Sequence, residues 1–441
     1  MKTKIRQSQI RPSGIDWIGD IPEGWSVSKF KANFIANTEK VKDHPTIDTP
    51  LSISGYRGVE PRNVDSMEGQ LPSEDTNSYR IVRVGQLAVN TMWLNYAGLG
   101  VSDYEGYVSP AYMSYRIKNP NLNPRFVHHL MRSPLYVQKY SSLLYGVRPN
   151  SLQVKSHDFE KIEIIIPPLE VQKKIADFLD EQISKIDQII EGKQKVIELL
   201  KEKRVSFITR VVTGGLNTKV KVKSPGVRWF DDIPQHWHIR KMKFLITSND
   251  GGVWGEADDP DGQPVLRSTE ITATGKWQID EKEIAYRALT KDEIFKGLLK
   301  EGDLLVTKSS GSEEHIGKTA FVTAEIADKR YCYSNFMQRL RANDLVHSKT
   351  LYYFMNSHAA REQYKYLTNS TTGLGNLNAD TLNSLCFLLI PKEEQGEITC
   401  FLDKEVEKID LVIEKNADQA KKLQEYRASL IYSAVTGKIE V

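Results

Sequence analysis

Residues 17–25 read WIGDIPEGW and residues 229–237 read WFDDIPQHW, so one unusual nonapeptide occurs twice in the chain. A second pair lies further along, because residues 185–191 read KIDQIIE and residues 408–414 read KIDLVIE, 223 positions later. This period is far longer than the roughly 20–50 residues of solenoid repeats. The repeats therefore predict two copies of one domain plan.

Further matches keep the same offset. They are Phe178-Leu179-Asp180 with Phe401-Leu402-Asp403, Arg204 with Arg427, and Val212-Thr213-Gly214 with Val435-Thr436-Gly437. An internal repeat outranks other sequence signals because it defines the architecture. The two nonapeptides are 212 positions apart, so the copies differ modestly in length between these matches.

Composition is typical of a soluble intracellular protein. The 441 residues suffice for two or more domains, and a hydrophobic content of 40% suffices for their cores. The net charge of +3 does not by itself indicate nucleic acid, so any basic surface must be local. The three cysteines form no CxxC pair, which fits a reducing cytosol. With no signal-peptide pattern and no apolar run near the roughly 18 residues of a membrane span, we expect a cytoplasmic protein without a membrane segment.

Each half of the sequence contains a region of mixed secondary structure. Residues 26–166 and 238–390 carry short runs rich in β-branched and aromatic residues, which are typical of strands. The runs are RIVRVGQLAVN, AYMSYRIK and KIEIII in the first half, and DLLVTKSS, TAFVTAEI and LCFLLI in the second. Short helical stretches lie at residues 124–140 and 348–366. Each region is therefore predicted to fold as an α+β domain.

A segment predicted to form one long helix follows each mixed region. From Glu170 to Val212 there is no proline, and Gly192 is the only glycine. Apolar residues recur there at the three- and four-residue spacings of a coiled-coil seam. The first seam is Leu179, Ile183, Ile186, Ile190, Ile197, Leu200, Phe207 and Val211; the second is Leu402, Val406, Ile409, Ile413, Ala420, Leu423, Leu430 and Ala434. Both seams are interrupted at equivalent places, by Lys193 and Asn416 and by Arg204 and Arg427.

The ends of the two helices are also marked in the sequence. Pro167-Pro168 and Pro391 precede them, and Gly214-Gly215 and Gly437 close them. One interpretation packs each helix on its own mixed domain, but the shared interruptions favour two helices that pack on each other. Duplicated units usually close with two-fold symmetry, and the connection 215–230 is shorter if the helices run antiparallel. We therefore predict an antiparallel pair.

Together these features resemble the specificity subunit of type I restriction-modification systems. The resemblance covers the whole chain and is carried by the two nonapeptides, the helix starts IPPLEVQKKIADFLD and IPKEEQGEITCFLD, and the two VTG turns. It implies an α+β fold with two mixed α/β target recognition domains, separated by a pair of long antiparallel coiled-coil helices, and a pseudo-two-fold internal duplication. The expected recognition domains are residues 1–166 and 215–390, and the expected helical spacers are residues 167–214 and 391–441.

The resemblance also implies a function. In that family each recognition domain reads one half of a split DNA sequence, and the subunit directs adenine-N6 methylation and restriction without catalysing either. The implied partners are double-stranded DNA, two methyltransferase subunits and restriction subunits. S-adenosylmethionine, ATP and Mg would be used by those partners, with no cofactor in this chain. Trp17 and Trp25 of the first nonapeptide would anchor the junction between domain and helix.

The residues fit a chain without a catalytic site. An adenine-N6 methyltransferase needs an Asn/Asp-Pro-Pro-aromatic loop to hold the flipped base, and the only Pro-Pro reads Ile166-Pro167-Pro168-Leu169. Residues 311–319, GSEEHIGKT, approach a phosphate-binding GxxxxGK[ST] loop, but five residues separate the glycines and two glutamates would face the phosphates. The following run, TAFVTAEI, is predicted as a strand rather than a helix. Histidines such as His128, His129 and His315 show no metal-ligand spacing, so no metal is expected.

The stretch DLLVTKSSGSEEHIGK has the features of a DNA contact instead. A strand runs into a polar, glycine-bearing loop whose donors reach phosphates and base edges. Its candidates are Thr307, Lys308, Ser309, Ser310 and Gly311. The corresponding stretch of the first half, VGQLAVNTMWLNYAGLGVS, offers Asn90, Trp93, Asn95 and Tyr96. An ordinary surface loop is the alternative in both places.

Two glycine-bearing polar turns ahead of the helices form a second pair of candidates. Residues 145–152 read YGVRPNSL, and residues 372–378 read TGLGNLN. The cationic candidates, which are able to contact a phosphate or a base, are Arg148 and Lys155. The candidates for contacts through a side-chain amide are Asn150, Asn376 and Asn378. A purely structural turn explains these residues equally well.

Three functions remain open at this level. The first is the DNA-reading subunit of a type I complex, the second is a DNA-reading subunit of another methylation or phage-defence system, and the third is a coiled-coil scaffold without a DNA role. Gel-shift assays with and without a methyltransferase partner separate the third from the others, and neighbouring reading frames separate the first two. The DNA target itself is not readable from the sequence, because readout also depends on loop geometry and DNA deformation.

Overall fold

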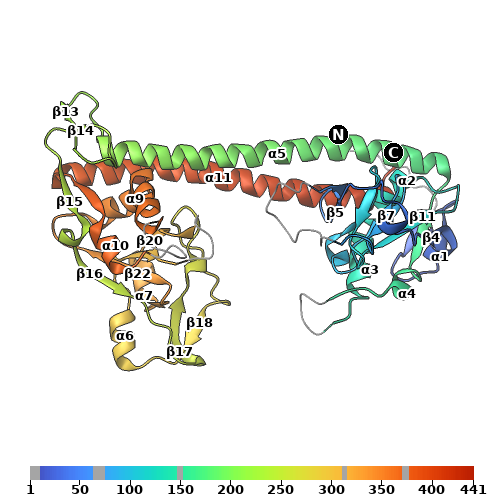
Figure 1. Cartoon of the computed structure of the whole chain (residues 1–441), viewed down its shortest axis with the longest axis horizontal. Helices are drawn as coiled ribbons and strands as arrows, with labels where there is room; N and C mark the ends of the chain where they lie inside the picture. Colours follow the sequence, from blue (N-terminus) through green and yellow to red (C-terminus); the bar gives the residue numbers. More distant parts are fainter. Residues whose placement is uncertain (1–9, 63–74, 147–151, 310–314, 370–376) are drawn as a thin grey trace. The chain divides into compact units, whose positions relative to one another are not determined.

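The computed structural model describes residues 10–62, 75–146, 152–309, 315–369 and 377–441 (Figure 1). The chain forms two compact units, each of which combines one mixed domain with part of both long helices. Unit 1 comprises Met1–Gly192 and Asp418–Val441, and unit 2 comprises Lys193–Ala417. Each unit therefore draws on both copies of the repeat.

Both units are built around a four-stranded antiparallel sheet of the same topology. In unit 1 the strand order is β4 (Phe34–Ala36), β11 (Met113–Ile117), β8 (Leu87–Val89) and β9 (Leu99–Val101). In unit 2 it is β16 (Ile246–Gly251), β22 (Met337–Ala342), β19 (Leu304–Thr307) and β20 (Thr319–Phe321). The matching sheets confirm the predicted α+β class and the internal duplication.

Smaller strand groups complete the units. Unit 1 pairs β1 (Ile10–Pro12) with β2 (Asp20–Pro22), β3 (Ser26–Lys29) with β12 (Glu163–Ile166), β5 (Leu51–Ser54) with β6 (Gly58–Pro61), and β7 (Arg80–Val82) with β10 (Gly106–Val108). Unit 2 pairs β13 (Val222–Lys223) with β14 (Ile233–Pro234) and β15 (His238–Lys241) with β23 (Cys386–Leu389), and joins β17 (Asp258–Leu266) to β18 (Ala285–Arg287) and β21 (Cys332–Tyr333). Within unit 2, β17 and β18 lie far from the long helices (Figure 1).

Short helices occupy the stretches predicted to be helical. These are α2 (Pro124–Met131) and α3 (Pro134–Ser141) in unit 1, and α8 (Ser348–Met355) and α9 (His358–Asn369) in unit 2. The remaining short helices are α1 (Phe30–Asn33), α4 (Ser156–Phe159), α6 (Lys291–Gly297), α7 (Ala324–Asp328) and α10 (Ala379–Ser384), with 3₁₀ turns η1 (Val41–Asp43), η2 (Leu94–Tyr96), η4 (Met242–Phe244) and η5 (Ser268–Glu270).

The prediction of a strand throughout TAFVTAEI is wrong in its second half. Strand β20 ends at Phe321, and α7 begins at Ala324. Thr323 caps this helix, because its hydroxyl accepts a hydrogen bond from the amide of Ile326 at 3.4 Å. A local cap therefore overrides the β-type composition of the run.

The two long helices are present as predicted. They are α5 (Leu169–Gly214) and α11 (Lys392–Val435), which begin directly after Pro168 and Pro391. Gly215 and Gly437 follow their C-terminal ends with φ of +75° and +71°, a conformation that glycine adopts without strain. No helix in the described ranges is both long and apolar enough to cross a bilayer.

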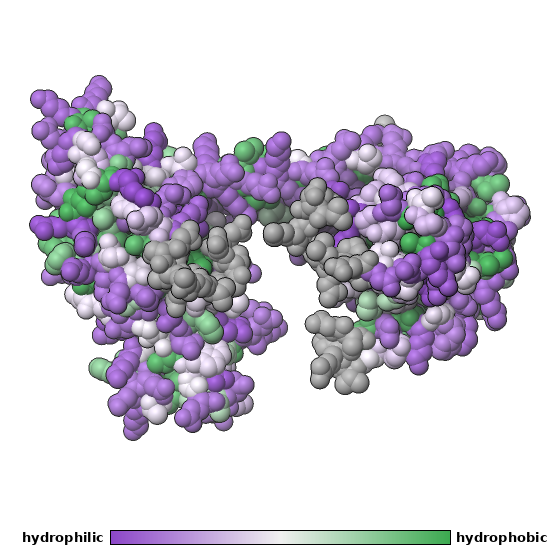
Figure 2. Space-filling view, viewed as in Figure 1, coloured by the Kyte–Doolittle hydropathy of each residue, from purple (hydrophilic) through white to green (hydrophobic). Residues whose placement is uncertain are grey.

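Within each unit the two helices pack on each other in opposite directions. In unit 1 Asp187 of α5 lies against Arg427 of α11, and Ile183 and Ile431 line one cavity. In unit 2 the ring centroids of Phe207 and Phe401 are 5.8 Å apart. Residue numbers rise along α5 as the numbers of their partners fall along α11, which confirms the antiparallel prediction. The outward faces of the helices are largely hydrophilic (Figure 2).

The polar interruptions of the two seams prove to be contacts between the helices. Arg204 is 2% exposed and donates from Nε to Oδ1 of Asp410 at 2.8 Å. Its repeat equivalent, Arg427, donates to Asp187 at 3.0 Å. Lys193 donates to the side-chain oxygen of Asn416 at 3.4 Å. The polar residues that interrupt the apolar seam of one helix therefore form hydrogen bonds with polar residues of the other helix.

Each helix pair shares a hydrophobic core with the domain of its own unit. The core of unit 1 joins Leu179 and Ala434 of the helices to Phe126 and Tyr136 of the domain. The core of unit 2 likewise joins Ile208 and Leu402 to Leu304 and Phe354. Because domain and helices bury one another's apolar surface, each domain is tied to its helices by packing.

Buried glutamines at the start of the long helices reinforce this attachment. Gln172 accepts a hydrogen bond from the amide of Asn123, and Gln395 accepts one from the amide of His347. Gln172 also donates to the carbonyls of Asn121 and Pro167, and Gln395 donates to those of Leu345 and Ile390. The same three bonds in both copies show that the duplication extends to side-chain contacts.

The nonapeptides lie beside the helix ends, as the resemblance implies. The ring of Trp25 lies 3.0 Å from the position that a Cβ would take on Gly437, and the ring of Trp237 lies 3.2 Å from that position on Gly215. Trp237 is fully buried and Trp25 nearly so. Trp17 packs elsewhere, because its indole donates to Glu163 at 3.1 Å and meets the edge of Tyr136. Trp25 and Trp237 therefore contact the glycines that close the helices, whereas Trp17 contacts Glu163 of β12.

Candidate nucleic-acid interface

The two candidate loops leave equivalent strands of the two sheets. The carbonyl of Thr91, just after β8, accepts a hydrogen bond from the amide of Val154 at 3.1 Å. The carbonyl of Lys308, just after β19, accepts one from the amide of Leu377 at 2.8 Å. Thr91 and Lys308 therefore occupy the same place in the two domains, which the constant offset of the helices did not reveal.

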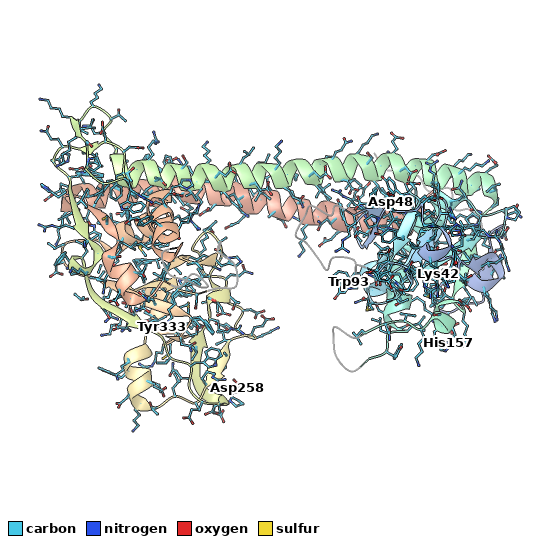
Figure 3. The ribbon with its side chains drawn as sticks, in the orientation of Figure 1. Lys42, Asp48, Trp93, His157, Asp258 and Tyr333 are labelled. Atoms are coloured by element: carbon cyan, nitrogen blue, oxygen red, sulfur yellow. The ribbon has the colours of Figure 1, made fainter. Side chains whose placement is uncertain are left out.

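The loop after β8 presents two aromatic side chains at the surface. Trp93 is 56% exposed and Tyr96 is 64% exposed, and their ring centroids are 5.7 Å apart. Figure 3 places Trp93 at the rim of its domain. The turn η2 lies at this point and is closed by Ala97 in the left-handed region, with φ of 56°. Aromatic side chains held on a fixed turn are able to stack on bases or wedge between them.

The two asparagines of this loop point largely inward. Asn90 is 4% exposed, and its side-chain oxygen accepts a hydrogen bond from the amide of Met92 at 3.2 Å. Asn95 is half-buried, and its side-chain oxygen has no hydrogen-bond partner in the described part of the chain. In this conformation neither amide offers the exposed pair of groups that adenine recognition needs. Trp93 and Tyr96 are therefore the stronger candidates.

Arg132 holds this loop through hydrogen bonds to its backbone. The sequence alone does not single out this residue. Its guanidinium donates to five backbone carbonyls, those of Leu99 (2.6 Å), Tyr56 (2.7 Å), Gly55 (3.0 Å), Ala97 (3.2 Å) and Ser54 (3.3 Å). Burial lowers the pKa of Arg132 to about 10, so it keeps its charge at neutral pH. Burial and the nearby Arg132 lower the pKa of His128 to about 3, so His128 is neutral. Nothing in the sequence marks Arg132, because all its partners are carbonyls distant along the chain.

In unit 2 the corresponding strand end combines polar and cationic residues with an exposed aromatic ring. Thr307 is fully buried, and its hydroxyl has no partner among the described residues, so it belongs to the core. Lys308 and Ser309 follow it and are half-buried. The amide of Lys308 donates to the carbonyl of Phe336 at 3.0 Å, and its ammonium lies beside Gly251. Phe336 is 58% exposed and adds an aromatic group that sequence analysis missed.

The second pair of candidate turns is only partly described. Lys155 is exposed, with its ammonium 4.5 Å from the ring centroid of Tyr145. The side-chain oxygen of Asn378 accepts a hydrogen bond from the amide of Thr381 at 2.8 Å, so Asn378 caps α10. Arg148, Asn150, Ser310, Gly311 and Asn376 lie outside the described residues.

The stretch that approaches a phosphate-binding motif has a different structure. Lys318, which would reach the phosphates, is 6% exposed and donates to the carbonyl of Ile271 at 2.8 Å. Strand β20 follows it directly, in place of the helix that such a loop requires. Lys318 therefore ties this turn to the body of the domain.

Comparison with protein families gives one match over more than half of the chain. The family described as "Type I restriction modification DNA specificity domain" matches residues 101–199 and 256–419. The two matched segments fall in the two copies of the repeat. They include the later part of both mixed domains, with β19, and much of α5 and α11.

The curated relatives and solved structures that are similar to the chain include specificity subunits of type I restriction enzymes. The specificity subunit of the type I restriction enzyme EcoKI from Escherichia coli (strain K12) is 28% identical over 276 residues, 62% of this chain and 56% of the relative. That of StySPI from Salmonella potsdam is 25% identical over 279 residues, 63% and 57% of the two chains. The matches thus span little more than half the length of these relatives. A chain solved in a study of the assembly and conformational transition of the type I R-M system shares the fold, with a TM-score of 0.66, 16% identity and coverage of 95% of this chain and 99% of that one.

Proposed function

The chain belongs to the family of type I restriction-modification DNA specificity domains, and on that premise we propose that it is the DNA-reading subunit of a type I restriction-modification complex. Each mixed domain reads one half of a split double-stranded target. The paired helices α5 and α11 carry the domains and receive two methyltransferase subunits. Restriction subunits complete the nuclease.

One observation carries this proposal, namely that the two sheets present different side chains at the same structural position. The loop after β8 offers Trp93 and Tyr96, whereas the residues after β19 offer Lys308 and Ser309. The backbone around both is held by equivalent hydrogen bonds. A common frame with different exposed groups suits a protein that reads two different half-sites, because side chains that reach base edges determine sequence preference.

The chemistry is assigned to the partner subunits. The described residues of this chain act by binding and orienting DNA, while S-adenosylmethionine, ATP and Mg serve the methyltransferase and restriction subunits. The flipped adenine needs a pocket that reads its Watson–Crick edge, and the chain's only Pro-Pro stands instead at the start of α5. In this proposal the role of the chain is to select where the methyl group is placed.

We expect the purified chain alone to transfer no methyl group to DNA. Duplex DNA and labelled S-adenosylmethionine are incubated with the chain, with methyltransferase subunits, and with both together. Only the mixture should form N6-methyladenine, and it should do so at a split site, because catalysis and sequence reading lie on different chains. Methyl transfer by the chain alone would contradict the proposal. A chain that retards no DNA with or without the methyltransferase would indicate a scaffold.

Lys308→Ala should remove one local contact to DNA, and its effect tells which kind of contact it is. If Lys308 contacts a phosphate, the substitution should weaken binding to all sequences and lower the slope of log K against log salt by about one unit. If it contacts a base, one position of one half-site should relax, by about 1–3 kcal/mol. Salt-dependent gel shifts and sequencing of methylated sites distinguish these results. Lys329→Ala, which removes an exposed lysine paired with Glu281 in the same mixed domain, is the control. Unchanged affinity, slope and methylated sequence would remove Lys308 from the interface.

A further inference from the structure

Two carboxylates at equivalent positions of the repeat connect three parts of their unit. In unit 1 Asp187 of α5 accepts hydrogen bonds from Arg427 of α11 at 3.0 Å and from the hydroxyl of Tyr56 in the mixed domain at 2.9 Å. In unit 2 Asp410 of α11 accepts one from Arg204 of α5 at 2.8 Å and pairs with the ammonium of Lys276 in the mixed domain at 3.2 Å. Each aspartate therefore joins both helices and the domain at one point.

A second carboxylate, one helical turn further on, takes part in the same contact. Arg57 lies 3.5 Å from Glu191, and Lys276 lies 3.1 Å from Glu414. Glu191 and Glu414 are also equivalent in the repeat. Residues four apart share a helix face, so each helix presents an Asp–Glu pair to its own domain.

The domain side of these contacts comes from turns of unlike sequence. In unit 1 the turn reads Ser54-Gly55-Tyr56-Arg57, between β5 and β6. In unit 2 it lies between Ile271 and Trp277, which form an isolated bridge. Tyr56 and Arg57 contact Asp187 and Glu191 of α5, whereas Lys276 alone contacts the equivalent Asp410 and Glu414 of α11. Because the unlike turns converge on equivalent carboxylates, the contact belongs to the common plan of the units.

Both turns are tied firmly to the sheet that bears the candidate DNA contacts. Arg132 donates to the carbonyl of Tyr56 and to that of Ala97, so one side chain holds the turn and the loop of Trp93 together. In unit 2 the indole of Trp277 donates to the carbonyl of Phe321 at 2.7 Å, at the end of β20. A displacement of either turn would thus be passed to the surface that is proposed to meet DNA.

The donors on the domain side stay in the form that the contacts need. Burial and the hydrogen bond to Asp187 raise the pKa of Tyr56 to about 12, so its hydroxyl keeps its proton at neutral pH. Burial opposes the charge of Lys276, but its bonds to Glu414 and Asp410 outweigh burial and raise its pKa. Both contacts therefore persist throughout the neutral range.

We propose that the pairs Asp187–Glu191 and Asp410–Glu414 are the locks that set the orientation of each mixed domain on its helices, with Tyr56 and Lys276 as positioning residues for DNA recognition. This inference rests on the proposed function. The apolar core attaches each domain, but non-directional packing permits small rotations. A directional polar contact beside the apolar attachment removes them, because Asp187 adjoins Ile183 and Asp410 adjoins Val406 of the two cores. Each reading surface then meets its half-site at one angle and one spacing.

The test weakens each lock without touching the reading surface or the ion pair between the helices. Lys276→Met removes the cation from unit 2 and keeps the length of its side chain, and Lys276→Arg restores the charge. Tyr56→Phe removes one hydroxyl from unit 1. Lys329→Met is the matched control, because Lys329 is similarly exposed and pairs with Glu281 inside the same domain, at 2.8 Å. Each protein is assembled with its methyltransferase partner and offered targets with altered spacers and altered half-sites.

In Lys276→Met, discrimination against spacers one base pair too long or too short should fall by about fivefold, because Lys276 loses its pairs with Asp410 and Glu414 but is itself partly exposed to water. The half-site read by unit 2 should relax with it, while the other half-site stays unchanged. Tyr56→Phe should relax the opposite half-site. Lys276→Arg and Lys329→Met should behave as the wild type. Full discrimination by both Lys276→Met and Tyr56→Phe would overturn the inference.

A second measurement without DNA separates the lock from the proposed function. Amide hydrogen exchange at residues 272–276 should become severalfold faster in Lys276→Met and stay unchanged in Lys329→Met, because local opening follows the loss of contacts that hold a segment. Unchanged exchange would show that no lock exists, even if the chain reads DNA. If Lys276→Met shows faster exchange but the wild-type chain binds no DNA, the lock exists and the proposed DNA-reading function is refuted.

Discussion

Asp410→Ala is expected to lower the free energy of unfolding of unit 2 by about 3–5 kcal/mol, because it leaves the Arg204 guanidinium buried without a counter-charge. The side chains of the two residues are 2% and 6% exposed, so water replaces little of the lost interaction. For a unit of this size the melting temperature should fall by on the order of 10 °C. Thermal unfolding followed by circular dichroism and calorimetry measures the effect.

A matched control lies on the same helix. Lys408 forms an exposed pair with Glu405 at 2.7 Å, and Lys408→Ala should change stability by less than about 0.5 kcal/mol. The double variant Arg204→Met with Asp410→Leu should recover most of the loss, because apolar side chains of similar size often replace a buried ion pair without penalty. A loss below about 1 kcal/mol in Asp410→Ala would mean that Arg204 finds water or another partner.

Exchange of one mixed domain is expected to rewrite one half of the DNA target and leave the other half intact. In this experiment residues 26–150 are replaced by the equivalent region of another specificity subunit. Each mismatched base pair costs about 1–3 kcal/mol, so a change of several positions should reduce affinity for the old target by about a thousandfold or more. Sequencing of methylated sites in cells that also carry the methyltransferase subunits reads both halves at once.

The reciprocal exchange, within residues 238–390, is the control and should alter only the other half. The donor for residues 26–150 should keep a hydrogen-bond donor opposite Asp187, because the exchanged region includes Tyr56. Donors without such a group should give the new half-site with a looser spacer. A change in both half-sites after either exchange would show that the domains do not read independently.

The sequence predicts where the candidate DNA-contact loops lie but not which of their side chains face outward. Strand-like runs that lead into polar turns predict the loops after β8 and β19, and the structure places both at equivalent strand ends. Which side chains face outward was not predictable, because Asn90 and Thr307 look like contact residues in sequence but are buried at these ends. Asn378 likewise serves as a helix cap. Polar residues at strand ends and turns satisfy nearby backbone groups as readily as they face a ligand.

The sequence by itself determined the duplicated plan, the α+β domains, the positions of the two long helices and their antiparallel pairing. These features depend on repeats, periodicity and caps, which are local or regular along the chain. The tertiary structure alone decided that Arg204 and Arg427 pair with Asp410 and Asp187, that Arg132 holds the aromatic loop, and that Tyr56 and Lys276 reach equivalent carboxylates. Each of these contacts joins residues far apart in sequence. The geometry that selects one charged partner among many arises only when the domain and the helices have packed together.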